Sequence, residues 1–282
     1  MQYILKPRDR VFDTDVQFPD IPEEKSVAIA FSGGMESTLI AHFAIQKYGV
    51  DRVYFVMFDN IFSRDVAIQT EVVANNVERA IYALNGKFEN FRRYTFDSNL
   101  HATERVRSLK IVEQTLRDDL PHVENIYFGF TNVFFDVEPL NSVSGYTVPD
   151  IRSIIESDRV KYERVIDEFH TDYNDKFLKL LLTMNIQPGT YDFLRTTPNV
   201  MMPFSNLDKG EIVDLYYQAQ LEDLLYETWS CTTFTVLGSD KHCGECFNCQ
   251  QRYDGHVHTN REDLTQYVNT VVKDIWNRRA AS

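Results

Sequence analysis

The chain has 282 residues, of which 43% are hydrophobic and 25% are charged, and its formal net charge is −13 at pH 7. These values fit a globular protein with one large domain, or one domain with an appendage. An acidic surface repels polyanions, which disfavours nucleic acid as the direct substrate but is compatible with a small molecule or a protein partner. The sequence has no run of about 18 apolar residues and no apolar signal core near its start, so we expect a cytoplasmic protein without a membrane span.

A glycine turn near the N-terminus is the strongest local feature. Residues 1–26 are polar and interrupted by prolines, and they predict a short extension with one edge strand. Residues 27–31 are apolar and predict a buried strand, which leads through the glycine turn into a helix. A strand, a glycine turn and a helix in this order build an anion site, because glycine lets the backbone approach a phosphate and the helix N–H groups point at it. The hydroxyls of Ser32, Ser37 and Thr38 would add donors, although a tight turn without a ligand has the same pattern.

Strands and helices alternate along the chain. We predict strands at 27–31, 52–58, 91–96 and 125–130 and one that ends at 203, and helices at 63–84, 103–120 and 149–184 and one that begins after residue 208. This alternation predicts an α/β fold with a doubly wound, mostly parallel sheet and right-handed crossovers. Asp59 and Asn60 follow the second strand, where they would line a ligand pocket at the carboxyl edge of the sheet or simply begin a turn.

The helix after the fifth strand has a recognisable start. Asp208 and Glu211 are three residues apart, which predicts a capping box in which each carboxylate accepts from the other residue's backbone N–H. Lys209 would then lie in the first helical turn and face the carboxyl edge of the sheet. Its ammonium could reach a phosphate there, and the alternative is an exposed lysine at a helix start.

All the cysteines of the chain lie in one segment. They have the spacing C-x11-C-x2-C-x2-C and are Cys231, Cys243, Cys246 and Cys249. Four thiolates suit a tetrahedral zinc ion with no open position, so we predict a structural Zn²⁺ site. An iron–sulfur cluster is a weaker alternative, and disulfides are disfavoured in a cytoplasmic chain. The neighbouring histidines, His242, His256 and His258, are expected at the surface or behind the sulfur ligands.

Residues 30–37, AFSGGMES, resemble the SGGxDS signature of the PP-loop ATP pyrophosphatases. In that family the loop holds the pyrophosphate end of ATP, and the enzyme transfers AMP to a substrate oxygen. Glu36 stands where the family has Asp, so its contact with magnesium or with the loop must shift. The residues expected to contact ATP and Mg²⁺ are Phe31, Ser32, Gly33, Gly34, Glu36, Ser37, Thr38, Asp59 and Lys209. Among them, we expect Ser32, Glu36 and Lys209 to act in catalysis.

Two further segments closely resemble the zinc segment of the 7-cyano-7-deazaguanine synthase, or QueC, family. Residues 228–231 read TWSC and residues 243–252 read CGECFNCQQR, against TWSC and CGxCxxCxxR in the family. The stretch 207–213 is also similar, and this carries the family's nucleotide contact over to Lys209. The family's substrate loops are matched only loosely, and its motifs Tyr-Gly-Gln-Arg-His and Val-Pro-Gly-Arg-Asn are missing. The implied substrate residues are Gly129, Asp136, Tyr146, Asp150 and Arg152.

The resemblance implies a PP-loop fold of the HUP-like Rossmann type with a C-terminal zinc-binding segment. The expected division is an extension over 1–26, a nucleotide-binding domain over 27–225, and a zinc segment with a C-terminal helix over 226–282. The implied reaction uses ATP to adenylate 7-carboxy-7-deazaguanine and ammonia to form the amide and then the nitrile, with release of AMP and pyrophosphate. Three alternatives stay open: an enzyme that stops at the amide or takes another carboxylate, a ligase that joins the deazaguanine to an amine of a partner protein, and a nucleotide-binding subunit without turnover. The chain could also form a homodimer.

Overall fold

The computed structural model describes residues 1–5, 10–59, 66–95, 114, 116–129, 131, 199–205, 207–231, 241–244 and 247–268. Within these ranges, no helix is long and apolar enough to cross a membrane. Of the helices that the sequence predicts, 149–184 lies outside the described residues, and 103–120 is described only in part, from residue 114.

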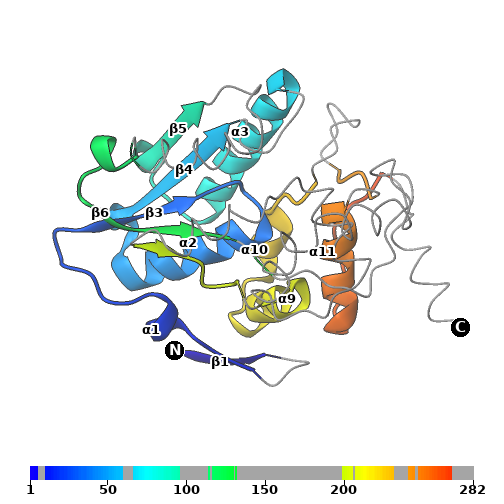
Figure 1. Cartoon of the computed structure of the whole chain (residues 1–282). Coiled ribbons are helices and arrows are strands. Elements are labelled where there is room, and N and C mark those ends of the chain that lie inside the picture. Colours follow the sequence, from blue (N-terminus) through cyan, green and yellow to red (C-terminus); the bar gives the residue numbers. More distant parts are fainter. Residues whose placement is uncertain are drawn as a thin grey trace, which may run out of the picture.

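A parallel sheet forms the centre of the described structure (Figure 1). Its strands are β3 (Ser26–Ala30), β4 (Val53–Asp59), β5 (Phe91–Thr95), β6 (Val123–Phe128) and β7 (Val200–Met201). They lie in the spatial order β5-β4-β3-β6-β7, so the chain moves outward from β3 on one side and then returns to build the other side. This reversal creates a topological switch point at the carboxyl ends of β3 and β6, which is where open α/β sheets bind their ligands.

Helices cover both faces of this sheet. α2 (Met35–Tyr48) and α3 (Val66–Ala83) pack on the face that carries Ile29. The neighbouring strand residue Ala28 points to the other face, where it packs in a cluster with Leu116 from the helical segment before β6. Successive strand residues alternate between the faces, so a run of buried residues requires cover on both sides. The prediction of a doubly wound parallel α/β sheet is therefore confirmed.

The N-terminal residues form a separate hairpin, so the prediction of one edge strand is wrong. β1 (Gln2–Leu5) and β2 (Arg10–Asp13) pair antiparallel with each other, in a sheet distinct from the main one within the described residues. Alternate residues of the hairpin, Tyr3, Leu5 and Phe12, face inward and join the main hydrophobic core. Buried and exposed residues alternate along each strand, although the exposed positions include the apolar Ile4 and Val11, and the two strands satisfy each other's backbone groups. The shorter elements are α1 (Thr14–Gln17), η1 (Val50–Arg52) and η2 (Phe88–Asn90).

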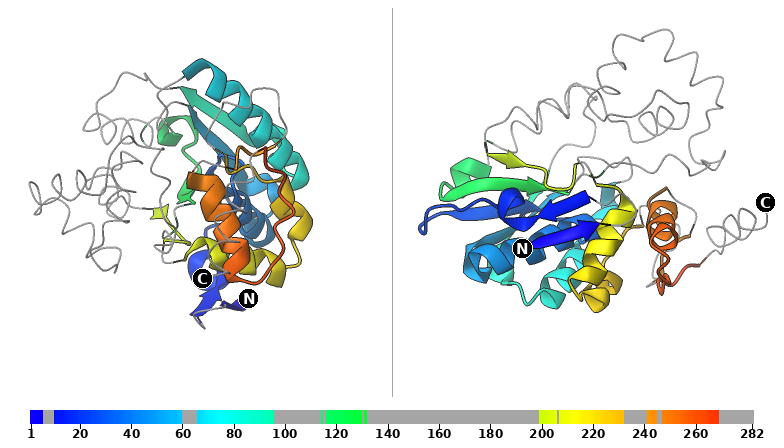
Figure 2. Two further views of the ribbon diagram at one scale, coloured as in Figure 1. Left: turned by 90° about the vertical axis from the view of Figure 1, so that its right-hand side faces the viewer. Right: turned by 90° about the horizontal axis from the view of Figure 1, so that it is seen from below.

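A group of helices lies at the carboxyl edge of the sheet (Figure 1). They are α9 (Lys209–Gln218), α10 (Glu222–Glu227) and α11 (Phe247–His258). α9 begins with the predicted capping box, in which Asp208 and Glu211 exchange carboxylate to backbone N–H hydrogen bonds of 2.9 Å each. α11 packs so closely on α9 that a Cβ on Gly255 would lie 2.8 Å from Lys209 O. Figure 2 (left) shows α11 in front of the sheet when the molecule is viewed from this side.

Candidate nucleotide and metal sites

The glycine loop joins the end of β3 to the start of α2. Gly33 has a φ of +70°, and a Cβ on it would lie 2.9 Å from Asn76 O, so a larger residue would be strained here. Gly34 precedes α2 and provides no side-chain cap for its first N–H groups. Uncapped N–H groups at a helix start, beside glycines, can donate to an anion. The loop therefore has the backbone geometry that phosphate binding requires.

The predicted side chains of the loop differ in their surroundings. Ser32 is exposed, and its Oγ lies 3.3 Å from Ser37 Oγ. The Ser37 hydroxyl is buried inside the loop, where it accepts from Ser32 N and donates to Gly34 O, each at 3.3 Å. Phe31 packs in the core, and the buried Thr38 hydroxyl has no hydrogen-bond partner among the described residues. Ser32 is thus open to a ligand and Ser37 shapes the loop, whereas a ligand contact of the buried Thr38 hydroxyl stays a prediction.

Glu36 and Lys209 meet beside the loop. The ammonium of Lys209, the first residue of α9, forms an ion pair with Glu36 Oε1 in the first turn of α2. The exposed fractions of these two side chains are only 12% and 13%. Thr131, which follows β6, donates from its Oγ1 to Glu36 Oε1 at 3.3 Å, and a Cβ on Gly129 would lie 2.9 Å from Glu36 Cβ. The segments after β3 and β6 and the start of α9 therefore converge at the switch point of the sheet.

Opposing effects act on the charge of Lys209. Burial lowers the pKa of the Lys209 ammonium from its usual value, and the positive charge of the Arg252 guanidinium lowers it further by a smaller amount. The direct contact with the Glu36 carboxylate acts in the other direction, because an opposite charge stabilises the charged form. The Glu36 carboxylate already balances the charge of the Lys209 ammonium, so a phosphate at the loop would have to share this ammonium with Glu36 or displace the carboxylate from it.

The remaining candidates are only partly described. Asp59 is the last residue of β4 and pairs in register with Thr95 of β5, so its backbone lies at the carboxyl edge of the sheet. Gly129 lies against the start of α2, where its close approach to Glu36 leaves no room for a side chain. The candidates that lie outside the described residues are Asn60, Asp136, Tyr146, Asp150 and Arg152.

Cysteines that are distant in the sequence form a buried cluster. The Sγ atoms of Cys231, Cys243 and Cys249 all lie within 4.8 Å of one another, and those of Cys243 and Cys249 are 3.8 Å apart. Thiolates that bind one tetrahedral zinc ion at about 2.3 Å have sulfurs about 3.8 Å apart, so the spacing fits a single ion. Cys243 N also donates to Cys231 Sγ at 3.4 Å, a contact that favours the thiolate form. Cys246, the fourth predicted ligand, lies outside the described residues.

The histidines that flank the cysteine segment are all at least partly buried. His242 is 4% exposed, and its Nδ1 lies 4.0 Å from Cys249 Sγ, so it packs behind the sulfur atoms. His256 is completely buried, and its Nε2 lies 3.7 Å from Asp263 Oδ1, so a surface position for this residue is wrong. Burial lowers the pKa of His256 to about 4, although the Asp263 carboxylate opposes the shift. His258 is half-buried.

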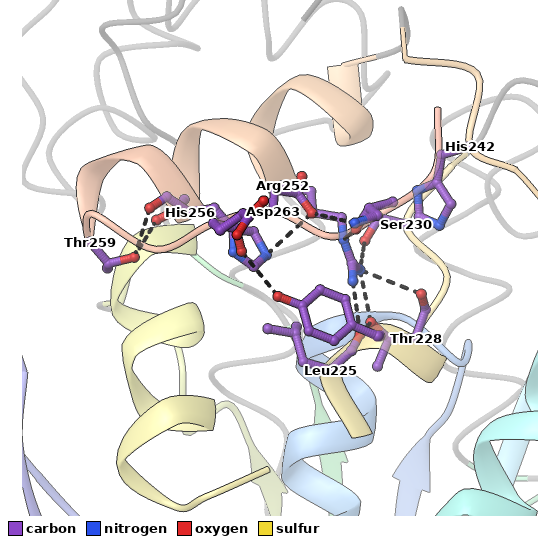
Figure 3. A network of polar contacts seen from close by, with 12 residues as sticks. Leu225, Thr228, Ser230, His242, Arg252, His256, Thr259 and Asp263 are labelled. Carbon is purple, nitrogen blue, oxygen red and sulfur yellow. Dashed lines mark hydrogen bonds and ion pairs between the residues drawn. The ribbon is translucent and has the colours of Figure 1, made fainter. Parts of the chain in front are cut away.

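Arg252, for which the sequence predicted no role, lies at the centre of a buried polar network (Figure 3). It is 1% exposed and lies on α11, one helical turn after Cys249. Its guanidinium donates to Leu225 O, Thr228 Oγ1 and Thr265 Oγ1, each at 2.8 Å. The sequence contains a signal for this position, namely the arginine that ends the CxxCxxR spacing. Residues three apart lie on the same helical face, so Arg252 is expected on the same side of the helix as Cys249.

Two sequence comparisons find the QueC family. Residues 163–260 match the family model described as "Queuosine biosynthesis protein QueC". Over 70 residues the chain is 34% identical to the 7-cyano-7-deazaguanine synthase 1 of Sulfurisphaera tokodaii. The aligned stretch covers 25% of this chain and 32% of that relative. The chain thus matches about a third of the length of this relative. The family match contains Lys209 and all the cysteines, and it does not extend to the glycine loop.

A comparison with solved structures finds two distant neighbours. The NH3-dependent NAD synthetase from Campylobacter jejuni has a TM-score of 0.38 and 13% identity, over 95% of this chain and 88% of that one. The U34-tRNA thiolase NcsA from Methanococcus maripaludis, with its 4Fe-4S cluster, has a TM-score of 0.40 and 10% identity, over 74% of this chain and 62% of that one. Because both scores are low, the fold assignment rests on the sheet order and helix layers described above. The predicted resemblance is confirmed by the sequence comparisons: over residues 163–260 this chain is similar to the QueC family.

Proposed function

We propose that this chain is a QueC-like, ATP-dependent ligase that converts 7-carboxy-7-deazaguanine and ammonia to the amide and then to the nitrile. The observation that carries the proposal is the ion pair of Glu36 and Lys209 beside the glycine loop. Lys209 belongs to the QueC-like segment, whereas the loop resembles the PP-loop signature. Contact between them supports one site built from two separate features of the sequence.

The chemistry requires an improved leaving group, because a carboxylate oxygen leaves poorly. Transfer of AMP from ATP to the carboxylate releases pyrophosphate, and ammonia then displaces AMP to give the amide. A second transfer of AMP to the amide oxygen releases another pyrophosphate, and loss of AMP and the remaining amide proton gives the nitrile. For these steps the protein needs to position the reactants and neutralise the pyrophosphate charge, rather than to supply a nucleophile.

The residues at the loop suit these needs. The backbone N–H groups of the loop and the first turn of α2 would donate to the phosphates, and Ser32 is the exposed hydroxyl beside them. Lys209, which pairs with Glu36 beside the loop, would contribute positive charge. Mg²⁺ that arrives with ATP would supply further charge neutralisation. Glu36 would be the carboxylate that holds it, and Asp59 lies at the neighbouring strand end.

The cysteine cluster would hold a structural Zn²⁺. Sulfur atoms 3.8 Å apart in the pair Cys243 and Cys249 suit one shared ion. In a four-iron cluster each thiolate binds a different iron, which moves the sulfurs further apart. This spacing supports zinc, with Cys246 as the fourth ligand.

The proposal is tested by measuring AMP and pyrophosphate release with ATP, Mg²⁺ and 7-carboxy-7-deazaguanine, with and without ammonia. We expect both products, and amide or nitrile only when ammonia is present. Release of ADP and phosphate would contradict the proposal. Lys209→Met should abolish pyrophosphate release. Lys47→Met, in a partly exposed ion pair with Asp20 at the far end of α2, is the matched control and should have no effect.

A further inference from the structure

We propose that Arg252 is a positioning residue for the glycine loop: it holds residues 225–230 so that the backbone N–H of Trp229 stays on the Gly33 carbonyl. This inference rests on the proposed function, because it takes the loop as the nucleotide site. It gives Arg252 a role in ATP affinity without any contact with ATP.

The guanidinium of Arg252 binds several points of the 225–230 segment at once (Figure 3). Nη2 donates to Leu225 O at 2.8 Å, while Nη1 donates to Thr228 Oγ1 at 2.8 Å and to Ser230 Oγ at 3.3 Å. The planar guanidinium group has N–H donors in fixed directions and can therefore hold the segment at all three acceptors. A lysine ammonium is a single point charge that cannot reach all three.

The other side of the guanidinium is also held. Arg252 Nε donates to Thr265 Oγ1 at 2.8 Å, and Thr265 is fixed in turn by a hydrogen bond from its N to Asp263 Oδ1 at 2.9 Å. The Arg252 side chain is 1% exposed, so a rotation of the guanidinium would leave buried donors unsatisfied. The network therefore fixes the position of the 225–230 segment relative to α11.

The same segment lies directly on the glycine loop. Trp229 N donates to Gly33 O at 2.8 Å, and a Cβ on Gly34 would lie 3.5 Å from Trp229 O. On its other side, Gly33 lies against the backbone of Asn76 in α3. The loop is thus enclosed between α3 and the segment that Arg252 holds. A shift of this segment would move the loop amides away from the geometry that binds phosphate.

Trp229 connects this arrangement to the cysteine cluster. Its indole Nε1 donates to Cys231 O at 3.0 Å, and its ring centroid lies 4.5 Å from that of His242. The backbone of Trp229 contacts the loop and its side chain contacts the cluster. Its fluorescence should therefore report changes at either site.

The chain contains two tryptophans, Trp229 and Trp276, so Trp276→Phe leaves Trp229 as the only indole. In this background, titration with Mg²⁺ and ATP should change Trp229 emission to a saturating value. Arg252→Lys keeps the positive charge but removes the guanidinium group and its fixed set of N–H donors. It should weaken ATP binding about tenfold, on the order of 1.4 kcal/mol, and shift Trp229 emission of the ATP-free protein. The matched control is Arg261→Lys, at an exposed arginine over the Tyr217 ring, which should change neither quantity.

A second variant covers the case in which Arg252→Lys does not fold. Thr265→Val removes one acceptor of the guanidinium but keeps its charge and its set of N–H donors, and it should weaken ATP binding in the same direction by a smaller factor. The inference is overturned if the folded variants bind ATP as tightly as the wild type and leave Trp229 emission unchanged. A wild type that binds no ATP in equilibrium dialysis would instead overturn the proposed function itself.

Discussion

Lys209 and Glu36, which lie far apart in the sequence, form an ion pair between the start of α9 and the first turn of α2. The signature that the loop resembles has Asp where this chain has Glu36. The extra methylene extends the carboxylate to Lys209 and to Thr131, from which it also accepts a hydrogen bond. The departure from the signature therefore has partners in the structure and lies in the proposed site.

The first prediction concerns the charge and length of Glu36. Glu36→Asp should keep pyrophosphate release within about tenfold of the wild type, on the order of 1.4 kcal/mol in the barrier, because the carboxylate remains. Glu36→Gln should lose far more, since it keeps the length but removes the counter-ion of Lys209. The control is Glu89→Gln, which breaks an exposed ion pair with Lys87 and should leave the rate unchanged.

One outcome would contradict the proposal that this site catalyses a reaction. A wild type as inactive as Glu36→Gln, together with a more active Glu36→Asp, would mean that the glutamate prevents turnover. The chain would then bind nucleotide without using it.

The second prediction uses two glycines with positive φ. Gly33→Ala and Gly49→Ala should both destabilise the fold, by about 1–3 kcal/mol of backbone strain. Only Gly33→Ala should abolish ATP binding, because its Cβ would also displace the loop from Asn76, whereas a Cβ on Gly49 has no atom within 4 Å. Thermal unfolding and ATP titration of both variants separate the two effects. Equal ATP affinity in the two variants would argue against a phosphate site at the loop.

The third prediction concerns the cysteine cluster. Elemental analysis should find about one zinc per chain, and removal of the metal by a strong chelator should lower solubility, because structural metal sites contribute to folding. Cys249→Ser should reduce both metal content and stability, since its Sγ lies 3.8 Å from that of Cys243. Cys246→Ser should behave in the same way if Cys246 is the fourth ligand. Iron with visible absorbance, or no metal at all, would contradict the zinc assignment.

The fourth prediction is a loss of stability in mild acid. Burial lowers the pKa of His256 to about 4 in the folded protein, whereas an unfolded histidine has a pKa of about 6.5. As the pH falls from 6.5 toward 4, the unfolded chain therefore binds a proton that the folded protein does not. The free energy of unfolding should decrease over this window, by up to about 3 kcal/mol.

Denaturant unfolding of the wild type and of His256→Gln, at pH 7 and pH 5, checks this effect. The variant should lose less stability between the two pH values than the wild type. A wild type and a His256→Gln variant with equal pH dependence would show that His256 is not the source.

The features that the sequence predicted correctly depend on residues close together in the chain. The apolar run of β3 and the alternation of strands and helices predict the parallel sheet, because strand and helix periods are local properties. The capping box of Asp208 and Glu211 is equally local, and the structure contains it. The cysteine spacing indicated a cluster, and the described cysteines meet with their sulfurs within 4.8 Å.

The tertiary structure alone decided which distant segments meet. No local pattern pairs Glu36 with Lys209, places Trp229 on the Gly33 carbonyl, or puts Arg252 at the centre of its network. The N-terminal hairpin was missed for the same reason, since a strand pattern does not say which strand is its partner. Side-chain periodicity specifies which residues turn inward, whereas the partner that each one finds depends on the packing of the whole chain. The sequence by itself therefore predicted the elements of the sheet and the types of candidate site, and the packing of α9 and of residues 225–230 against the loop decided how these candidate sites are joined.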